Sequence, residues 1–380
     1  MSGSAVVVGG GIGGLSAALA LRRAGWDVQV FERAPELREV GAGLSLLANG
    51  LRGLAALGLG DAVRGGGQRT APAGLRRPDG RWLSRVDGGD LDRALGTTAV
   101  GLHRATLHGI LRGALPASAL RTGVTVLDVD PAGRVDHSSG GTTGSTRADL
   151  IVAADGIRSV VRSRLWPATV PRYSGSTTWR AVIPWPDPLP VAVTWGPGTE
   201  FGTVPIGADQ MYWYGAFNAP AGERAEDELA AARARFGGWH DPIPALLAAT
   251  PPAAVLRDDL YYLDPPLPTY VRDRVVLLGD AAHAMTPHLG QGANQAIEDA
   301  VVLGAALSRE ADVPTALIGY DRQRRPRTQE VVAASLRAAR VGQQLANPAG
   351  VALRNALIRL TPATVALRSM ARYADWRPPA

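Results

Sequence analysis

The sequence contains no cysteine. This absence excludes a disulfide framework, a thiolate nucleophile and a cysteine-ligated metal ion, and we expect no metal site of any kind. A chain without disulfides fits a reducing compartment, so a cytoplasmic location is expected. Lysine is absent as well, and every basic side chain is Arg or His. Reactions that depend on a catalytic lysine are therefore excluded.

Long uncharged apolar runs are also missing. No apolar stretch reaches about 18 residues without a charge, so no transmembrane helix is expected. The apolar run at 5–8 has no basic segment before it and is interrupted by glycine, which argues against a signal peptide. The net charge is +6, and its densest group, at 322–327, is interpreted as a solvated helix face. No aromatic or motif support accompanies it, so we expect neither a nucleic-acid nor a membrane partner.

The chain does contain a large apolar fraction. Apolar residues make up 46% of 380 residues, which is enough for a substantial interior and favours two closely packed domains. A strand at 5–8, a helix at 15–24 and a strand at 26–31 are expected to form a βαβ unit. Further strands are expected at 124–129, 148–154, 202–206, 211–217 and 275–278, and further helices at 51–59, 103–115, 223–236 and 291–307 and in the remainder, with breaks at Pro348 and Pro362.

Two regions differ from this nucleotide-binding pattern. Residues 170–220 are rich in Trp, Tyr and Thr and alternate over short runs, which predicts an antiparallel sheet. Residues 71–97 are polar and rich in Gly and Pro, and are expected to be irregular. The elements typical of nucleotide binding thus lie at both ends of the chain, and the antiparallel sheet lies between them. The second domain is therefore inserted into the first.

The first motif that carries chemistry is G-x-G-x-x-G at 9–14, between the first strand and its helix. Its glycines permit a tight turn and close approach of a pyrophosphate, and the helix N-terminus supplies free N–H groups. Glu32, at the end of the second strand, can accept hydrogen bonds from a ribose; a glycine-rich surface turn would leave it unexplained. An acidic residue at this place favours FAD or NAD over NADP.

Two further motifs follow strands. Asp280 comes directly after the apolar run at 275–278, and a Gly-rich turn at 290–294 then begins a helix whose dipole can face an anion. The third motif, Asp155-Gly156, comes after the strand at 148–154. Taken alone it fits an ordinary turn with a capped helix start equally well. No second G-x-G-x-x-G follows a strand, so an enzyme that holds NADPH on a Rossmann domain of its own is not expected; if the chain is a flavoprotein, NAD(P)H is expected to visit the flavin and leave.

Together the three motifs resemble the class A flavoprotein monooxygenases, the para-hydroxybenzoate hydroxylase fold, and especially its small salicylate- and 6-hydroxynicotinate-hydroxylase-like members. The resemblance covers about residues 5–340. It implies non-covalent FAD, with Asp280 on the ribitol chain and Asp155-Gly156 facing both FAD and the nicotinamide cofactor. The oxygenating species implied by the family is a flavin C4a-hydroperoxide, and no catalytic triad is needed. Other matching positions are Gly41-Ala42-Gly43, Asn49, His103-Arg104, Leu107, Trp179-Arg180, Gly237-Gly238-Trp239 and Asp299-Ala300.

The predicted cofactor-binding residues come from these matches. They are Gly9, Gly11, Ile12, Gly13, Gly14, Glu32, Arg33, Gly43, Arg104, Val126, Asp155, Gly156, Gly279, Asp280, Gly290, Gly292, Ala293 and Asn294. The helix that begins near 290–294 would stabilise the negative charge of reduced flavin at N1–C2=O.

The substrate pocket is predicted on the antiparallel sheet. Tyr212 and Tyr214 share one face by the period of two, and Trp213 lies on the other; core packing is the alternative role for the tyrosines. Arg180 can bind an anionic substrate or form a structural ion pair. Leu44 completes the predicted substrate-binding set.

Three further positions bear on the pocket. His288 beside Pro287 is predicted near the reacting ring, and these two are the candidate catalytic residues; His283 is expected to pack or to bond the backbone. Glu200 occupies the position at which some relatives acting on anionic heterocycles have arginine, which argues against a strongly anionic substrate.

The fold class predicted is α/β, a Rossmann-type FAD-binding domain with an inserted antiparallel-sheet substrate domain and C-terminal helices. The FAD-binding domain is assigned to 1–70, 98–168 and 270–335, the substrate domain to 71–97 and 169–269, and a helical segment to 336–380. The function predicted is an FAD-dependent monooxygenase that consumes NAD(P)H and O2 and oxygenates, most simply hydroxylates, a small aromatic or polycyclic substrate, as a monomer or homodimer.

Alternatives of other classes stay open at this point. They are a non-oxygenating FAD reductase or dehydrogenase, an epoxidase or Baeyer–Villiger variant of the same fold, and a catalytically silent flavin-binding protein. A flavin halogenase is disfavoured, because Trp179–Pro184 lacks the second tryptophan of that family's motif and the chain has no lysine.

Overall fold

The computed structural model describes residues 3–37, 42–70, 72–85, 88–187, 189–310 and 312–379. The α-helices are α1 (Ile12–Arg23), α2 (Ala48–Ala56), α3 (Gly60–Gly66), α4 (Gly88–Leu95), α5 (Arg104–Gly113), α6 (Val160–Leu165), α7 (Glu228–Phe236), α8 (Ile243–Ala249), α9 (Asp280–His283), α10 (Gly292–Arg309), α11 (Val313–Val341), α12 (Pro348–Leu360) and α13 (Ala363–Ala374). Short 3-10 turns occupy Ala117–Ala119, Pro252–Ala254 and Pro287–Leu289.

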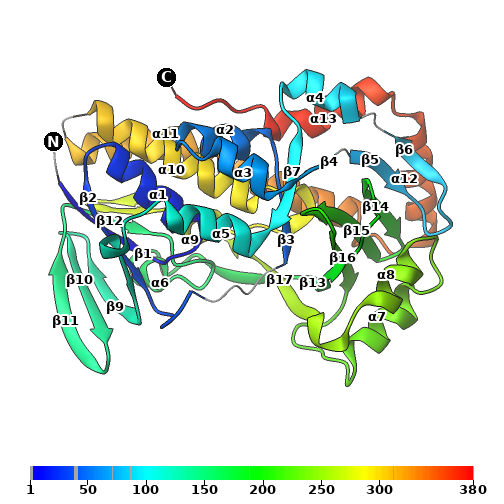
Figure 1. Ribbon diagram of the computed structural model, residues 1–380, viewed down its shortest axis with the longest axis horizontal. Coiled ribbons are helices and arrows are strands. Elements are labelled where there is room, and N and C mark those ends of the chain that lie inside the picture. The colour runs from blue at the N-terminus through cyan, green and yellow to red at the C-terminus, as the bar shows by residue number, and fades with distance from the viewer. Residues whose placement is uncertain are drawn as a thin grey trace.

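The strands fall into four sheets (Figure 1). They are β1 (Ser4–Val8), β2 (Asp27–Glu32), β3 (Gly43–Leu46), β4 (Gln68–Thr70), β5 (Pro72–Arg76), β6 (Trp82–Arg85), β7 (Ala99–His103), β8 (Leu120–Thr122), β9 (Val124–Asp130), β10 (Arg134–Ser139), β11 (Thr142–Arg147), β12 (Leu150–Ala153), β13 (Val170–Pro184), β14 (Val191–Gly196), β15 (Thr199–Ile206), β16 (Gln210–Asn218), β17 (Leu256–Asp264), β18 (Val271–Arg272) and β19 (Val275–Leu277).

The first sheet is built from both ends of the chain. Its strand order is β18-β19-β12-β1-β2-β8, and every pairing except β18 with β19 is parallel. The central strands are buried along their length, as parallel strands covered on both faces must be. Helices α1, α10 and α11 lie along one side of this sheet in Figure 1. This arrangement confirms the predicted α/β class with a Rossmann-type unit.

The composition and the C-terminal end of α1 follow from local features of the sequence. Leu and Ala dominate α1, and Gly25 follows it with φ of +84°, a conformation that glycine adopts without strain. The N–H groups of Gly25 and Trp26 donate to the carbonyls of Arg22 and Leu21, so a Schellman motif closes the helix. The chain then turns directly into β2. The predicted βαβ unit is therefore confirmed, with boundaries shifted by one to three residues.

The largest sheet has the order β17-β13-β16-β15-β14-β5-β6 and is antiparallel except where β14 pairs with β5. One face carries a cluster that includes Trp179, Phe201 and Trp213 and packs on α7 and α8. The opposite face carries Tyr212 with Val204 and Ile206. Both the antiparallel sheet at 170–220 and the facing of its strands were predicted correctly.

Some expectations about the elements were wrong. Residues 71–97 are not irregular: β5 and β6 extend the large sheet and α4 follows them, because β5 finds a partner in β14, far along the chain. The helix expected at 223–236 begins only at Glu228, where Asp227 caps the N–H of Ala230. The assigned domain limits stay a prediction.

The two C-terminal breaks were expected, and Pro348 and Pro362 stand at the beginnings of α12 and α13. Within the described ranges, no helix is long and apolar enough to cross a membrane.

Candidate functional site

The three motifs meet at one edge of the first sheet. The parallel strands β2, β1, β12 and β19 lie side by side, so their carboxyl ends share that edge. Glu32 ends β2, Gly9 follows β1, Asp155 lies just beyond β12 and Asp280 just beyond β19. The strand order changes direction on either side of β1, and open α/β sheets bind ligands at such a point.

The glycines of the first motif each have a separate physical role. Gly9 has φ of +103°, and an added Cβ would lie 2.5 Å from the carbonyl oxygen of Ala154. A Cβ on Gly14 would lie 2.0 Å from the Gly9 oxygen, and one on Gly13 would lie 2.9 Å from Leu278. A Cβ on Gly11 would meet nothing within 4 Å. Gly11 thus borders open space at the start of α1, where a pyrophosphate can approach the backbone.

Glu32 lies beside that space. Its two carboxyl oxygens accept the N–H groups of Gly10 at 2.7 Å and Ala34 at 2.8 Å. Each oxygen keeps a lone pair for a ribose hydroxyl. A cleft of about 530 Å³ opens here; it is lined by Gly10, Gly11, Glu32, Ala34, Pro35, Glu36, Leu37, Arg104, Ala105, His108, Gly109 and Arg112.

One wall of the cleft was only partly predicted. Arg104, His108 and Arg112 line it from α5, and they stand four residues apart on one helix face. The Nε2–H of His108 donates to the carbonyl of Gly10 at 2.7 Å, so the helix is joined to the glycine loop. Only Arg104 was named from the sequence. His108 and Arg112 follow Arg104 at intervals of four residues on a predicted helix, and this spacing was the signal that would have identified them.

Asp155 is held by the start of α6. One carboxyl oxygen accepts the N–H of Val160 at 2.8 Å, and the other is buried and has no partner among the described residues. Burial raises the pKa of this carboxyl, against hydrogen bonds that lower it. The capped helix start weighed from the sequence is therefore present, yet it uses only one of the two oxygens. Gly156 follows with φ of +80° and open space around its Cα.

Asp280 is exposed in the first turn of α9, and Gly279 before it has φ of +60°. The loop is fixed from behind by Asp299 of α10. One carboxyl oxygen of Asp299 accepts the N–H of Gly279 at 3.0 Å and lies 2.6 Å from Nε2 of His283. The side chain of Asp280 itself is left facing outward at the carboxyl edge of the sheet.

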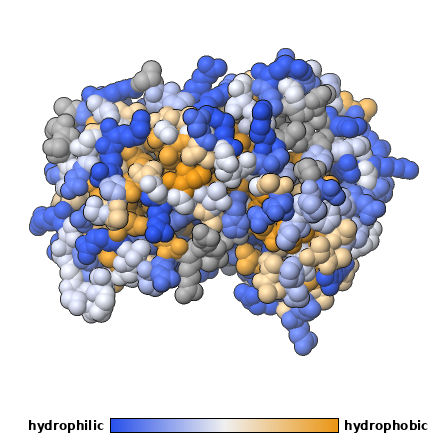
Figure 2. Space-filling model, in the orientation of Figure 1, coloured by the Kyte–Doolittle hydropathy of each residue, from blue (hydrophilic) through white to orange (hydrophobic). Residues whose placement is uncertain are grey.

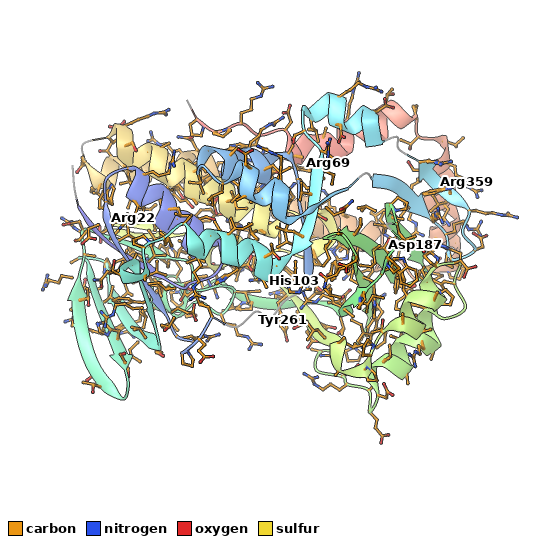
Figure 3. The ribbon with its side chains drawn as sticks, in the orientation of Figure 1. Arg22, Arg69, His103, Asp187, Tyr261 and Arg359 are labelled. Atoms are coloured by element: carbon orange, nitrogen blue, oxygen red, sulfur yellow. The ribbon has the colours of Figure 1, made fainter. Side chains whose placement is uncertain are left out.

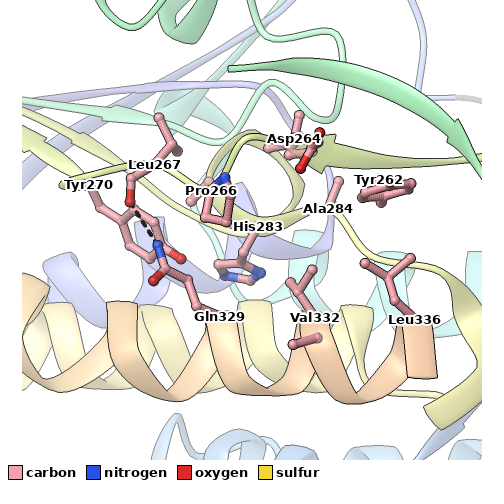
Figure 4. A pocket seen from close by; sticks show the side chains of 13 residues that line it. Tyr262, Asp264, Pro266, Leu267, Tyr270, His283, Ala284, Gln329, Val332 and Leu336 are labelled. Atoms are coloured by element: carbon pink, nitrogen blue, oxygen red, sulfur yellow. Dashed lines mark hydrogen bonds between the residues drawn. The ribbon is translucent and has the colours of Figure 1, made fainter. Parts of the chain in front are cut away.

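The hydrogen-bond partner of His283 differs from the one expected. The ring is buried, as expected, but it bonds a carboxylate and not the backbone. It borders a separate cavity of about 90 Å³ between the end of β17 and α11, seen in Figure 4, where Gln329 Nε2 donates to the carbonyl of Leu267 at 2.7 Å. The lining of this cavity does not include the motif glycines or Glu32. His283 therefore faces away from the cofactor edge.

The N-terminus of α10 has no side-chain cap. Gly290 has φ of +61°, and a Cβ on Gly292 would meet nothing within 4 Å, so the backbone there is open to a ligand. The side chain of Asn294 is not open. It accepts from the N–H of Leu47 and donates to the carbonyls of Ser45 and Gly290, and it is fully buried. For Asn294 the expected cofactor contact can come only from its backbone.

The large sheet turns its Tyr212 face toward β3 and β7 of the β3-β7-β4 sheet. A Cβ on Gly43 of β3 would lie 2.4 Å from Tyr212, so glycine permits this close packing. Burial raises the pKa of Tyr212 to about 12. Burial and the neighbouring Glu200 also hold the pKa of Tyr214 well above its usual range. Both phenols therefore stay protonated at neutral pH and can donate hydrogen bonds.

Charged groups on the same face are already paired. The Arg180 guanidinium forms an ion pair with Asp258, so the structural alternative weighed for this arginine is observed. Glu200 is 5% exposed and accepts from Trp195 Nε1 at 2.7 Å. Glu200 pairs with Ala216 two residues beyond Tyr214, so its side chain and that of Tyr214 share a face. Arg180 is therefore ion-paired through its terminal nitrogen, while its buried Nε–H has no hydrogen-bond partner among the described residues.

His288 and Pro287 lie in the 3-10 turn before α10. Both ring nitrogens of His288 are shielded from solvent and have no hydrogen-bond partner in the part of the chain that the structure describes. Buried polar atoms without a partner are rare, and such atoms beside an open backbone favour a ligand. Pro287 is exposed.

The remaining predicted residues are less informative. Leu44 is partly buried on β3. Val126 lies in the buried core and Arg33 is exposed, and neither lines the cleft; Ile12 is buried and Ala293 is partly buried. Gly41 lies outside the described residues.

The residues present fit FAD. The open backbone at Gly11, the carboxyl of Glu32, the free oxygen of Asp155 and the outward Asp280 form one continuous edge, with an uncapped helix N-terminus at each end. Residues 3–335 match the FAD binding domain family. The chain belongs to this family.

Named relatives extend the match. The chain is 40% identical to the aurachin C monooxygenase/isomerase of Stigmatella aurantiaca, over 89% of each chain. It is 36% identical to the 2-heptyl-3-hydroxy-4(1H)-quinolone synthase of Pseudomonas aeruginosa, over 94% of each chain. The solved structure of Klebsiella pneumoniae HpxO complexed with FAD and uric acid has a TM-score of 0.91 and 28% identity, and covers 98% of this chain and 96% of that one. This member of the FAD binding domain family is an FAD-dependent monooxygenase with NAD(P)H as co-substrate.

Proposed function

We propose that this monooxygenase hydroxylates a neutral aromatic heterocycle held between the FAD edge and the Tyr212 face of the large sheet. The observation that carries this proposal is the charge of that face: Arg180 is neutralised by Asp258, and Glu200 adds a buried carboxyl group. An anionic ring would meet repulsion from Glu200, and Arg180 is already paired with Asp258. A neutral ring with an N–H group would find an acceptor there.

One relative supports the choice of a neutral ring. A 4(1H)-quinolone, as in the name of the Pseudomonas aeruginosa relative, is a neutral bicycle with a ring N–H. Bound FAD, once reduced by NAD(P)H, supplies the activated oxygen. The chain's own residues would bind the ring, orient it and exclude water. Tyr212 and Tyr214, held protonated, would donate to a ring carbonyl, and His288 would lie at the turn next to the reacting atoms.

For the cofactor, we propose a division of roles along the edge. The N–H groups at Gly11 and Ile12 would hold the pyrophosphate, Glu32 the adenosine ribose and Asp280 the ribitol. Arg104, with His108 and Arg112 beside it, would supply positive charge along the cleft. The backbone at Gly290–Gly292 would face the flavin ring. We place the enzyme in the cytoplasm, where NAD(P)H is available, as a monomer or homodimer.

The substrate proposal is tested with a matched pair of compounds, 4(1H)-quinolone and its 2-carboxylate. Two like charges about 4 Å apart repel by about 4 kcal/mol at an effective dielectric constant of 20, so the wild type should prefer the neutral ring by more than tenfold in kcat/KM. Glu200→Arg should reverse the preference, whereas Glu200→Gln should only weaken it. The readouts are ring-stimulated NAD(P)H oxidation and incorporation of labelled dioxygen. Equal or better use of the carboxylate by the wild type would refute the proposal.

Asp280→Ala is expected to weaken FAD binding about ten- to hundredfold, because a charge-assisted hydrogen bond contributes ~1.5–3 kcal/mol. The side chain is exposed, so the free energy of unfolding without flavin should change little. Flavin fluorescence titration measures the dissociation constant. Asp61→Ala, at an exposed carboxylate of α3, is the control and should bind flavin like the wild type. An unchanged dissociation constant for Asp280→Ala would contradict the assignment.

Two glycine variants should separate binding from folding. Gly11→Ala places a methyl group in open space, so the apoprotein should stay folded while FAD binding is lost. Gly14→Ala places its methyl group 2.0 Å from the Gly9 oxygen, so this variant should lose about 1–3 kcal/mol of stability. Thermal unfolding with and without FAD distinguishes the two. If Gly11→Ala binds FAD normally, the pyrophosphate does not lie at the start of α1.

A further inference from the structure

Helix α12 places Arg354 inside and its leucines outside. The Arg354 side chain is buried, donates to the carbonyl of Gly342 at 2.7 Å and lies 5.1 Å over the ring of Trp195. Leu353, Leu357 and Leu360 are 63%, 58% and 80% exposed. A helix on a soluble domain normally turns its apolar stripe toward the core. The inverted arrangement leaves an apolar surface that the described part of the protein does not cover.

The exposed leucines form one continuous stripe. Positions 353, 357 and 360 follow the helical spacing i, i+4, i+7 and so lie on one face. Two further exposed apolar side chains lie on the flanking helices: Val341, 57% exposed, at the end of α11, and Val365, 50% exposed, just past the junction with α13. Apolar surface is visible at the upper right of Figure 2, over the meeting of α12 and α13. These five side chains are called the α12 stripe below.

The chain segment that carries the α12 stripe contributes positive charge alone. Between Glu330 and Asp375 the sequence has six arginines and no acidic residue. Glu330 is paired with Arg372, and Asp375 with Arg52. The arginines that are exposed and form no ion pair in the described ranges are Arg337, Arg340, Arg359 and Arg368. Arg359 lies at the outer margin of the molecule in Figure 3.

Charge decides which partner fits the stripe. A second copy of the chain would bring two cationic surfaces together, and five side chains are few against the roughly 20–30 residues per side of a stable protein interface. A lipid surface with anionic headgroups meets both features. Leucines enter the boundary between headgroups and acyl chains, and arginines extend to the phosphates.

We propose that the α12 stripe docks the enzyme on an anionic membrane surface, lying in the interface without spanning it. The sequence alone predicted no membrane partner, and the flotation experiment below decides between that prediction and this proposal. The proposal depends on α12 and its arginines alone, and not on the identity of the substrate.

Vesicle flotation of the flavin-loaded enzyme tests the proposal. The enzyme should float with vesicles that contain phosphatidylglycerol, stay behind with pure phosphatidylcholine vesicles, and dissociate at high salt. Leu353→Ser/Leu357→Ser/Leu360→Ser should lower the bound fraction on anionic vesicles more than about tenfold, as should Arg359→Glu/Arg368→Glu, since each basic side chain contributes ~1 kcal/mol at such a surface. The control Leu127→Ser/Ile318→Ser removes exposed apolar side chains elsewhere and should float like the wild type.

The oligomeric state of the same variants, measured by light scattering, provides the second readout. The flavin content, unfolding temperature and oligomeric state of the leucine variant should equal those of the wild type. Flotation that is unchanged by the leucine substitutions would overturn the proposal. So would a wild type that floats on neither vesicle, or a leucine variant that converts a dimer to a monomer, because the stripe would then join two copies of the chain.

Discussion

Arg324→Ala should lower the free energy of unfolding by about 3–5 kcal/mol and release most of the bound flavin. Arg324 is 1% exposed, and its guanidinium bonds Glu298, Asp299 and the side-chain oxygen of Gln295. Its removal leaves two buried carboxylates short of a cation. Urea unfolding measures the stability, and the absorbance of the purified protein measures flavin content.

The loss of flavin follows from what Asp299 holds. The oxygen of Asp299 that Arg324 does not bond accepts the N–H of Gly279 and contacts His283, so the carboxylate fixes the loop before Asp280. Arg325→Ala is the control, because Arg325 is partly exposed and pairs only with Asp321 one turn away; its cost should stay within about 1 kcal/mol. If Arg324→Ala unfolds at the wild-type urea concentration, the buried network does not stabilise this edge.

The same network predicts the acid limit of stability. Burial alone would raise the pKa of Asp299, but the adjacent His283 and Arg324 outweigh burial and lower it to about 2. A carboxyl whose pKa is lower in the folded state stabilises the fold above its unfolded pKa, and this contribution is lost as the pH falls from about 4 toward about 2. Without Arg324 the pKa of Asp299 rises toward its unfolded value, so this contribution to stability should be smaller and its loss should be complete at a higher pH.

Trp213→Ala should lower stability, whereas Tyr214→Ala should lower the coupling of NAD(P)H consumption to product formation, although the two residues are neighbours in β16. Trp213 is fully buried, stacks on Phe201 with ring centroids 5.4 Å apart and donates from Nε1 to Thr250 at 2.9 Å. Its deletion should cost about 3–5 kcal/mol of stability. Tyr214→Ala should keep the flavin but misplace the substrate, and a displacement of ~1 Å can cost about a hundredfold in the productive step.

The measurement is product formed and hydrogen peroxide released per NAD(P)H consumed. Tyr214→Ala and Tyr212→Ala should release more peroxide, whereas Trp213→Ala should lower the unfolding temperature and leave this ratio near that of the wild type. Tyr214→Phe, which removes only the hydroxyl group, should lie between. The contrary result would be a well-folded Trp213→Ala variant that releases more peroxide per NAD(P)H while both tyrosine variants stay tightly coupled. That result would mean that the pocket lies on the other face of the sheet.

Local patterns predicted well that the three motifs meet at one edge of the sheet and which faces the strand residues occupy. Residues that follow parallel strands lie at one edge of the sheet. The sequence alone therefore predicted that Glu32, Asp155 and Asp280 lie along the same edge. The period of two likewise separated Trp213 from its neighbouring tyrosines. In both cases the information lies within a few residues of the side chain concerned.

The predictions that were wrong concern residues whose partners lie far away in the sequence. The arginines at 322–327 were interpreted as a solvated face, yet Arg324 is buried and Arg327 bonds Glu298. Their partners lie on α10, and charge patterning along α11 carries no information about a facing helix. The same reason applies to β5, whose partner β14 follows more than a hundred residues later.

The sheet built from both ends of the chain has a consequence for biosynthesis. Strand β12 leaves the ribosome early, but its neighbour β19 and the loop that carries Asp280 emerge only after the entire β13–β17 insertion. Until then β12 is an unpaired edge strand of the first sheet, the kind of surface that favours wrong pairing. A nascent chain therefore cannot recruit its flavin during most of its translation, and any product terminated before β19 lacks Asp280, the backbone at Gly290–Gly292 and the strand that closes the edge.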